Sequence, residues 1–491
     1  MVQLRRLVFK YNRAFFLLVI GWSAVFVYEA VRQVIHLGER REGNEGPGIF
    51  APRNDIQHND KQFQPDAELQ RTIFQIQEPN FFKFSDFDCS NVSRPTETYS
   101  RVFDVWYYYA RLPVYEIFVY SVYYDDRIDN GILPSLRILN VGRTIKDPNK
   151  LYCQVWFPGF NKPYVTEAII KKNGAGHGIN KVHYEQYYFT CKLPTSYPLP
   201  SHLSLVSTPC EAPSSYIPVQ VPVRTPPVHE FGICVPISFQ HVNPHLLVEW
   251  LEASRLLGVT EVNVYHNHMS NESMNVLRHY ERDGFVRLWP IPSVPKYEDT
   301  RGGNKIGSPI SLNDCMYRNT YRYRWAVVID FDELIVPRKD TNYTAMLARI
   351  DREAKLEETP PSYTFRNAYF WIGCDSEVKK TLKKVILTET KRQTPSKFLY
   401  AAKSIIDPRR CVSVFNHYCY HRFPTKRKIR WTIDVKSDIA LSHHYREVYQ
   451  GKKNKPQCDQ LKNITSKDNI ISKFSSKLEK LYSNGISQVG L

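Results

Sequence analysis

Three acidic residues end an apolar run near the middle of the sequence. The stretch "RWAVVIDFDELIVPR", residues 324–338, places Asp330, Asp332 and Glu333 directly after an apolar segment. Acids are rarely buried unless they are paired or bind a metal. In an extended chain Asp330 and Asp332 share one face, and two carboxylates on one face favour a hard divalent cation between them. The pattern alone leaves open the alternative of a solvated turn.

The elements that precede the acids predict a parallel α/β sheet. Strands are predicted at four apolar runs, residues 231–239, 259–267, 285–291 and 325–333. Helices are predicted at the periodic segments between them, residues 243–258, 273–284 and 311–324. Strands and helices that alternate in this way form parallel sheets, which bind ligands at the carboxyl ends of their strands. The acids follow the fourth strand and are therefore expected at a binding edge.

A different pattern precedes this region. Residues 71–224 hold short runs of β-branched and aromatic residues between turn signals, which predicts a β-rich domain with an antiparallel sheet or a sandwich. The Pro-rich residues 209–230 are expected to be an extended linker. Residues 32–70 lack periodicity beyond the first few positions and are predicted to be a flexible stem.

The N-terminus carries the pattern of a membrane anchor. A basic segment, residues 1–13, precedes a largely apolar stretch over residues 14–31. We expect an uncleaved transmembrane signal anchor with residues 1–13 in the cytoplasm and the rest of the chain in the lumen. A cleaved signal peptide is the alternative, but no small-residue cleavage site follows the stretch.

The cysteines and glycosylation signals agree with a lumenal location. All ten cysteines lie after the apolar stretch, which favours disulfides in an oxidising compartment. Sequons occur at Asn91, Asn271, Asn342 and Asn463 and predict glycosylation. The formal net charge is +17, but a lumenal chain has no access to nucleic acid, so we expect no nucleic-acid partner.

Several blocks, in order, resemble glycosyltransferase family 92. They are "CVPISF", "LLVEWLEASRLLGVTEVNVYHN", "LNDCMYRNTYRYRWAVVIDFDELIVP", "KSIIDPRRCVSVFNH" and "LSHHYR", and they span residues 231–446. The resemblance implies a GT-A-like, Rossmann-type α/β catalytic domain over residues 225–450. On this basis the chain consists of the anchor, the stem, the β-rich domain, the catalytic domain and a C-terminal extension over residues 451–491.

The resemblance also implies an activity. Characterised animal members of the family are inverting β-1,4-galactosyltransferases that use UDP-galactose, and some act on galactose or core fucose of N-glycans. We therefore expect a single-pass type II Golgi membrane protein that transfers a hexose, galactose by resemblance, from a UDP-sugar to a glycan or glycoprotein acceptor in β-linkage. A non-catalytic glycan-binding or scaffolding protein of the secretory pathway is the alternative.

The resemblance to GT-A sites implies that the acid cluster binds a divalent cation. Asp330 is expected to contact the donor ribose or a metal-bound water, and Asp332 to ligate Mn²⁺ or another divalent ion. His444 is the preferred histidine ligand over its neighbour His443, because the family pattern resembles "HYR". His417 is a second candidate.

The remaining candidate residues concern the donor, the acceptor and the base. Tyr265 and Asn267 lie at the carboxyl end of the second predicted strand and are expected to line the nucleotide pocket. Residues 301–309, "RGGNKIGSP", are predicted to be a Gly-rich loop in which Arg301 or Lys305 pairs with the diphosphate. Inversion needs a base near the acceptor hydroxyl. The candidates are Asp375 and Glu377, and Trp371 beside them is a candidate platform for the acceptor.

Overall fold

The structure is a computed structural model that describes the chain from residue 87 onward. The described residues are 87–95, 105–111, 115–127, 134–143, 150–173, 177–179, 182–195, 197–292, 301–356, 358–372, 383–423, 431–448, 458, 461 and 465–491. The tail, the anchor and the stem predicted over residues 1–70 lie outside this set, as do Asp375, Glu377 and Asn463. Within the described part, no helix has the length and apolar character needed to cross a membrane.

The first described half forms a ten-stranded sheet in the order β5-β4-β9-β10-β2-β3-β8-β6, with β1 on β2 and β7 on β8. Its strands are β1 (Tyr107–Arg111), β2 (Tyr115–Asp125), β3 (Ser135–Arg143), β4 (Tyr152–Trp156), β5 (Tyr164–Glu167), β6 (Ile169–Lys172), β7 (His177–Ile179), β8 (Val182–Lys192), β9 (His202–Val206) and β10 (Ile217–Gln220). All neighbours are antiparallel except β10 and β2. The predicted antiparallel sheet is therefore confirmed apart from that pair.

This sheet curls around its own core. The Cys153–Cys191 disulfide joins β4 to β8, although four strands separate them in the sheet order. On one face of each strand the buried apolar side chains, Val155 and Phe189 among them, belong to one cluster. The alternation of apolar and polar positions along the strands supplies this inner face.

The second half contains the predicted parallel sheet. Its elements are β11 (His229–Gln240), α3 (Pro244–Leu256), β12 (Glu261–Met269), α4 (Asn271–Arg282), β13 (Val286–Pro290), α5 (Arg301–Arg318) and β14 (Tyr323–Val328). The strands β13, β12, β11 and β14 are adjacent and parallel. Local signals set the helix ends: Asn243 and Ser270 cap α3 and α4, and Gly258 and Gly284 follow them with positive φ. The predicted alternation of strands and helices is confirmed.

Two local predictions are wrong. Residues 301–309 are the first half of α5, not a Gly-rich loop. Glycine and proline argue against a helix, but tertiary packing overrides this weak propensity: the later turns of α5 are buried, and Cys315 is bonded to Cys234 of β11. The strand predicted over 325–333 also ends early, at Val328, because the chain turns between Asp330 and Glu333.

That turn sends the chain into a second sheet, in the order β15-β23-β17-β18-β24. Its strands are β15 (Glu333–Pro337), β23 (Ala440–Glu447), β17 (Asn367–Ile372), β18 (Lys391–Gln393) and β24 (Thr465–Lys467). The parallel sheet is extended by β19 (Lys403–Ile406), β16 (Ser362–Phe365) and β22 (Ile433–Asp434), and a separate hairpin consists of β20 (Cys411–Val414) and β21 (Cys419–Arg422). The shorter helices are α6 (Tyr343–Glu353), α8 (Val385–Thr388) and η2 (Ile470–Phe474).

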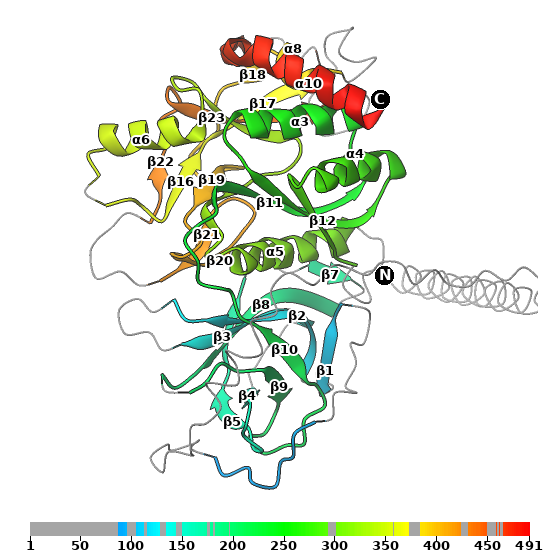
Figure 1. Cartoon of the computed structure of the whole chain (residues 1–491), viewed down its shortest axis with the longest axis vertical. Helices are drawn as coiled ribbons and strands as arrows, with labels where there is room; N and C mark the ends of the chain where they lie inside the picture. The colour runs from blue at the N-terminus through cyan, green and yellow to red at the C-terminus, as the bar shows by residue number, and fades with distance from the viewer. Residues whose placement is uncertain are drawn as a thin grey trace, which may run out of the picture. The chain divides into compact units, whose positions relative to one another are not determined.

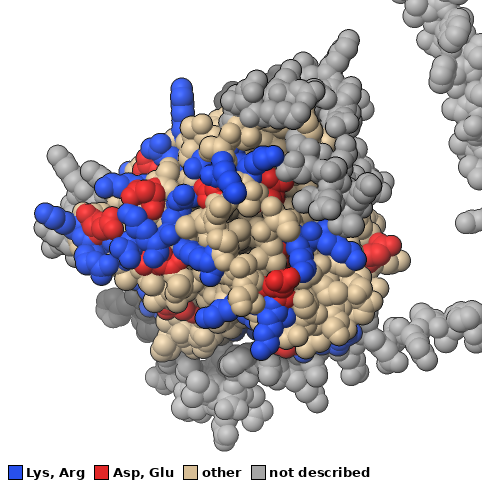
Figure 2. Space-filling model, turned by 90° about the horizontal axis from the view of Figure 1, so that it is seen from above, with Lys and Arg blue, Asp and Glu red and all other residues tan. Residues whose placement is uncertain are grey.

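The residues set apart as a C-terminal extension pack into this body. β24 pairs with β18, and the last helix, α10 (Ser475–Val489), lies beside α3 (Figure 1). The Tyr482 hydroxyl lies 3.0 Å from His245 Nδ1, and Gly485 allows close packing, because a Cβ there would lie 2.6 Å from the Tyr280 hydroxyl. On the face seen from above, Lys and Arg side chains are interspersed with Asp and Glu (Figure 2).

Candidate active site

The three acids lie at the carboxyl end of the parallel strand β14, as the sequence predicts. One oxygen each from Asp330, Asp332 and Glu333 can be chosen so that all lie within 4.8 Å of one another. Their backbone is held from two sides: Trp250 Nε1 donates to the Glu333 carbonyl at 2.6 Å, and the Tyr445 N–H donates to the Asp332 carbonyl at 2.7 Å. The edge of the parallel sheet and the start of the second sheet thus fix the cluster together.

A lysine that the sequence analysis did not single out lies within the cluster. Lys403 opens β19 with its side chain only 2% exposed, and its Nζ lies 2.5 Å from Asp330 Oδ2 and 2.7 Å from Glu333 Oε2. It also donates to the Asn416 carbonyl at 3.3 Å. A lone basic residue at the start of the buried strand "KSII" was the signal available in the sequence.

Burial and this lysine set the charge of the cluster. Burial raises the pKa of Glu333 to about 7, and the neighbouring Asp330 carboxylate acts in the same direction, while Lys403 opposes both. Burial also disfavours the charged form of Asp330, but Lys403 outweighs it and holds the pKa of Asp330 below its ordinary value. The cluster therefore combines an ionised Asp330 with a Glu333 that retains its proton more readily than an exposed glutamate does.

His444 meets the acids from the neighbouring strand. It is the register partner of Glu333 across β15 and β23, with its Nε2 at 3.2 Å from Asp332 Oδ2 and its Nδ1 at 3.2 Å from Glu333 Oε1. Burial lowers the pKa of His444, but the hydrogen bond to Asp332 and the charge of Glu333 outweigh burial and raise it.

The other two candidate histidines make different contacts. His443 points to the opposite face of β23, where it is stacked on Phe370 and burial lowers its pKa to about 3. Nδ1 of His417 lies 2.9 Å from the Ala402 carbonyl, and burial lowers its pKa to about 4. The structure thus brings His444, rather than His443, to the acids.

The donor atoms of the cluster fit a hard divalent cation. The side chains of Asp330 and Asp332 are both 44% exposed; Lys403 occupies one oxygen each of Asp330 and Glu333, and Asp332 contacts His444. The 3.2 Å between Asp332 Oδ2 and His444 Nε2 is close to the spacing of two adjacent ligands that each bind one ion at about 2.1 Å. Asp332 and His444 would hold the ion, with Asp330 next to them in the acid cluster.

The candidate donor-binding residues are more dispersed. Tyr265 is fully buried, and its hydroxyl donates to Asp314 Oδ2 at 2.6 Å. Asn267 is also buried, close to the carboxyl end of β12. Arg301 and Lys305 lie in the first turns of α5, where only the backbone is described. Tyr265 is therefore placed beneath the surface of the site rather than on it.

Three consecutive residues of α5, the "NDC" of the family block, link the surrounding elements. Asn313 bonds both backbone groups of Val414 in the β20–β21 hairpin, at 2.8 Å each. Asp314 accepts hydrogen bonds from Tyr265 and from Tyr123 of the β-rich half. Cys315 is bonded to Cys234. The helix thus joins both halves of the described chain to the site.

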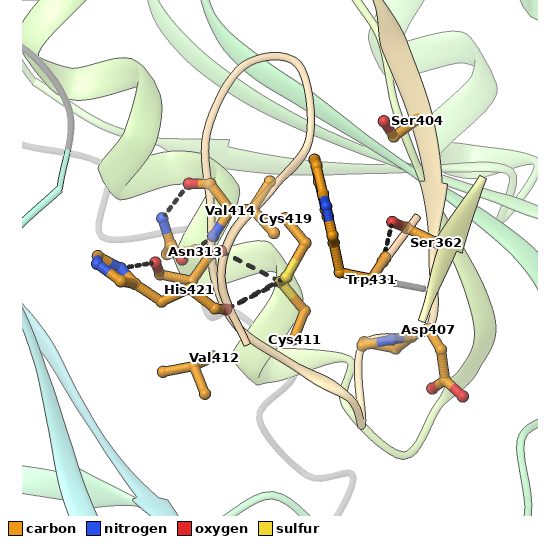
Figure 3. The surroundings of a disulfide bond; sticks show 12 residues. Asn313, Ser362, Ser404, Asp407, Cys411, Val412, Val414, Cys419, His421 and Trp431 are labelled. Carbon is orange, nitrogen blue, oxygen red and sulfur yellow. Dashed lines mark hydrogen bonds between the residues drawn. A yellow bond between two sulfur atoms is a disulfide. The ribbon is translucent and has the colours of Figure 1, made fainter. Parts of the chain in front are cut away.

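The hairpin next to Lys403 is closed by a disulfide. Cys411 and Cys419 join β20 to β21, with Asn313 against Val414 on one side (Figure 3). The hairpin loop supplies the Asn416 carbonyl to Lys403 and the His417 carbonyl to Ser404 Oγ. The disulfide therefore closes the loop that contacts the buried lysine.

The sequons differ in their surroundings. Asn91 and Asn271 are exposed. Asn342 is half-buried and caps α6 through its side-chain oxygen, which accepts the Ala345 N–H at 2.9 Å. Glycosylation of these residues and of Asn463 remains a prediction.

The chain is similar to known proteins. The chain is 24% identical over 232 residues to "Beta-1,4-galactosyltransferase galt-1" of Caenorhabditis elegans; the match covers 45% of this chain and 51% of the relative. The chain thus spans about half the length of that curated relative. A solved structure titled "Crystal Structure of a Mycobacterial Protein" is 10% identical and matches 54% of this chain and 76% of that one, with a TM-score of 0.22. The sequence model of glycosyltransferase family 92 matches residues 229–483, more than half of the chain, and the chain therefore belongs to glycosyltransferase family 92.

Proposed function

We propose that the chain is an inverting, metal-dependent enzyme that transfers a hexose, namely galactose, from a UDP-sugar to a glycan acceptor in β-linkage. Membership of the family and the name of the worm relative, a β-1,4-galactosyltransferase, support a transferase with a nucleotide-sugar donor. The observation that carries the proposal is the Asp332–His444 pair, 3.2 Å apart at the carboxyl edge of the parallel sheet. We further propose Golgi residence and type II topology. The disulfides support this proposal, because such bonds form in an oxidising lumen.

In the proposed reaction the acceptor oxygen forms a bond to the anomeric carbon while the bond from that carbon to the diphosphate oxygen breaks. Asp332 and His444 would hold a divalent ion, which would supply positive charge to neutralise the charge that develops on the leaving UDP. Asp330, fixed by Lys403, presents its free oxygen to the donor ribose or to a water. The acceptor proton passes to a base, for which Asp375 and Glu377 remain the candidates.

The test measures UDP release by the purified full chain with UDP-galactose, a panel of glycans and Mn²⁺. We expect UDP release to depend on the acceptor, to stop in EDTA and to be lost in Asp332→Asn. Full activity in EDTA would refute the metal mechanism. Glycan binding without release from any common UDP-sugar would instead favour a non-catalytic glycan-binding protein.

A further inference from the structure

One face of the second sheet continues outward from the metal-ligand pair. Tyr369 of β17 is the register partner of His444, and Trp371 is the partner of Arg446 two positions along β23. Because partners in register share a face, Tyr369, Trp371 and Arg446 lie on the same side of the sheet as His444. We call Tyr369 and Trp371, together with Tyr400 introduced below, the aromatic row.

The rings of His444, Tyr369 and Trp371 follow one another along this face. The Tyr369 ring centroid lies 4.9 Å from that of His444, and the Trp371 centroid lies 5.3 Å from Tyr369 with the planes 24° apart. Both aromatic residues are partly exposed. Nε1 of Trp371 has no hydrogen-bond partner among the described residues. The row therefore offers partly exposed ring faces beside the proposed reaction centre, whereas the Trp371 N–H itself is buried.

A strained turn adds a third ring. Leu399 and Ala401 have φ values of 67° and 48°, in the left-handed region that non-glycine residues rarely adopt, and Tyr400 between them is 66% exposed. Such strain costs about 1–3 kcal/mol per residue and is concentrated at functional sites. The turn precedes Lys403 by only two residues.

The turn is also tied to the aromatic row. Ser396 N donates to the Asn367 carbonyl at 2.8 Å, and Ser396 Oγ donates to the Tyr400 carbonyl at 2.8 Å. Asn367 begins the strand of the row, and its buried side-chain amide has no partner among the described residues. Burial raises the pKa of Tyr369, and Tyr400 adds to this effect, while Arg446 opposes it.

We propose that Tyr369, Trp371 and Tyr400 form the binding platform for the acceptor glycan. This assignment rests on the proposed function. The apolar faces of sugar rings stack on aromatic rings, while the N–H groups of the partly exposed Arg446 suit sugar hydroxyls. The row lies on the second sheet, whereas a nucleotide is expected at the carboxyl edge of the parallel sheet. The metal-ligand pair stands where the two sheets meet, so the platform places an acceptor on the side opposite the nucleotide.

The test uses two single variants of the full chain, Tyr400→Ala and Trp371→Ala. Tyr420→Ala is the control. Tyr420 is 43% exposed, but its ring contacts Phe415 and His421 in the hairpin. We expect each platform variant to raise the acceptor KM by about tenfold or more, the loss of one stacked ring, while the KM for UDP-galactose and the unfolding midpoint stay unchanged. The control should leave both KM values unchanged.

Glycan-array binding without donor separates this inference from the proposed function. Binding by the wild-type chain that is lost in Tyr400→Ala and Trp371→Ala supports the platform even if no transfer is detected. Equal binding by wild type and variants, no glycan binding at all, or an effect on the donor KM alone would overturn the platform.

Discussion

Nζ of Lys403 and Oε2 of Glu333 lie 2.7 Å apart, with side chains only 2% and 3% exposed, beneath the exposed Asp332 carboxylate. A buried charge of this kind is costly unless a partner is present. The pair thus forms a buried support for the site, and the carboxylates of Asp330 and Asp332, each 44% exposed, are its most accessible groups.

Removal of the lysine should therefore destabilise the protein strongly. Lys403→Met leaves Asp330 and Glu333 without their cation, and we expect a loss of about 3–5 kcal/mol in the free energy of unfolding, measured in urea. The double variant Lys403→Met/Glu333→Gln should recover part of this loss, because it removes one uncompensated acid. Lys339→Met, which breaks the exposed pair with Asp438, is the control and should leave stability unchanged. A similar result for both lysines would contradict the role given to Lys403.

The proposed metal ligands should affect transfer and Mn²⁺ binding, whereas Lys403 affects stability. Asp332→Asn and His444→Gln are expected to lower transfer by about a hundredfold or more, because each removes one donor to the ion that stabilises the leaving group. Calorimetric titration of Mn²⁺ into the chain without donor should show weaker binding in both variants. Asp438→Asn, an exposed acid, serves as the control for both measurements. Unchanged Mn²⁺ affinity in both variants would remove them as ligands.

Much of this architecture follows from local sequence patterns. The spacing of apolar residues and the residues at the helix ends predict β11, α3, β12 and α4. The order of strands and helices then places the acids at the carboxyl end of β14. Lys403 was not predictable in this way, because it lies 73 residues from Asp330 in the sequence and meets it only through the antiparallel pairing of β19 with β14. The helical start of α5 was missed because packing around Cys315 overrides the local propensity of glycine and proline.

The hairpin disulfide should stabilise both the fold and the site. Cys411 and Cys419 are eight residues apart, and the loss of so short a cross-link is expected to cost about 2–3 kcal/mol by loop entropy. In Cys411→Ser/Cys419→Ser the loop that holds Lys403 is freed, so transfer should also fall at temperatures where the chain remains folded. Circular dichroism against temperature and UDP release check the two effects.

A second disulfide supplies the control for this experiment. Cys89→Ser/Cys210→Ser removes a cross-link of the β-rich half, at a sequence separation of 121. It should lower stability but leave the transfer rate of the folded chain unchanged. Equal losses of transfer in the two double variants would show that the hairpin has no special part in the site.

Glu249 should make stability depend on pH. It lies on α3 fully buried, where it accepts N–H groups of Ile386 and Leu387 in α8 at 3.0 and 2.9 Å. Burial raises its pKa to about 7, although these N–H groups oppose the shift. The pKa of a glutamate in an unfolded chain is about 4.3. At a pH between these two pKa values the folded chain therefore binds more protons than the unfolded chain. The contribution of Glu249 is therefore greatest below about pH 4 and is lost as pH rises through 7, by at most roughly 3–4 kcal/mol.

Urea unfolding at pH 5, 6, 7 and 8 tests this sign. The wild-type chain should lose stability across this range more steeply than Glu249→Gln, whose side chain has no proton to release. Glu281→Gln, an exposed glutamate of α4, should keep the wild-type slope. Because the amide introduced by Glu249→Gln replaces one acceptor by a donor, the two proteins are compared by slope rather than by stability at one pH. Parallel slopes for wild type and Glu249→Gln would show that Glu249 is already ionised at pH 5 in the folded chain.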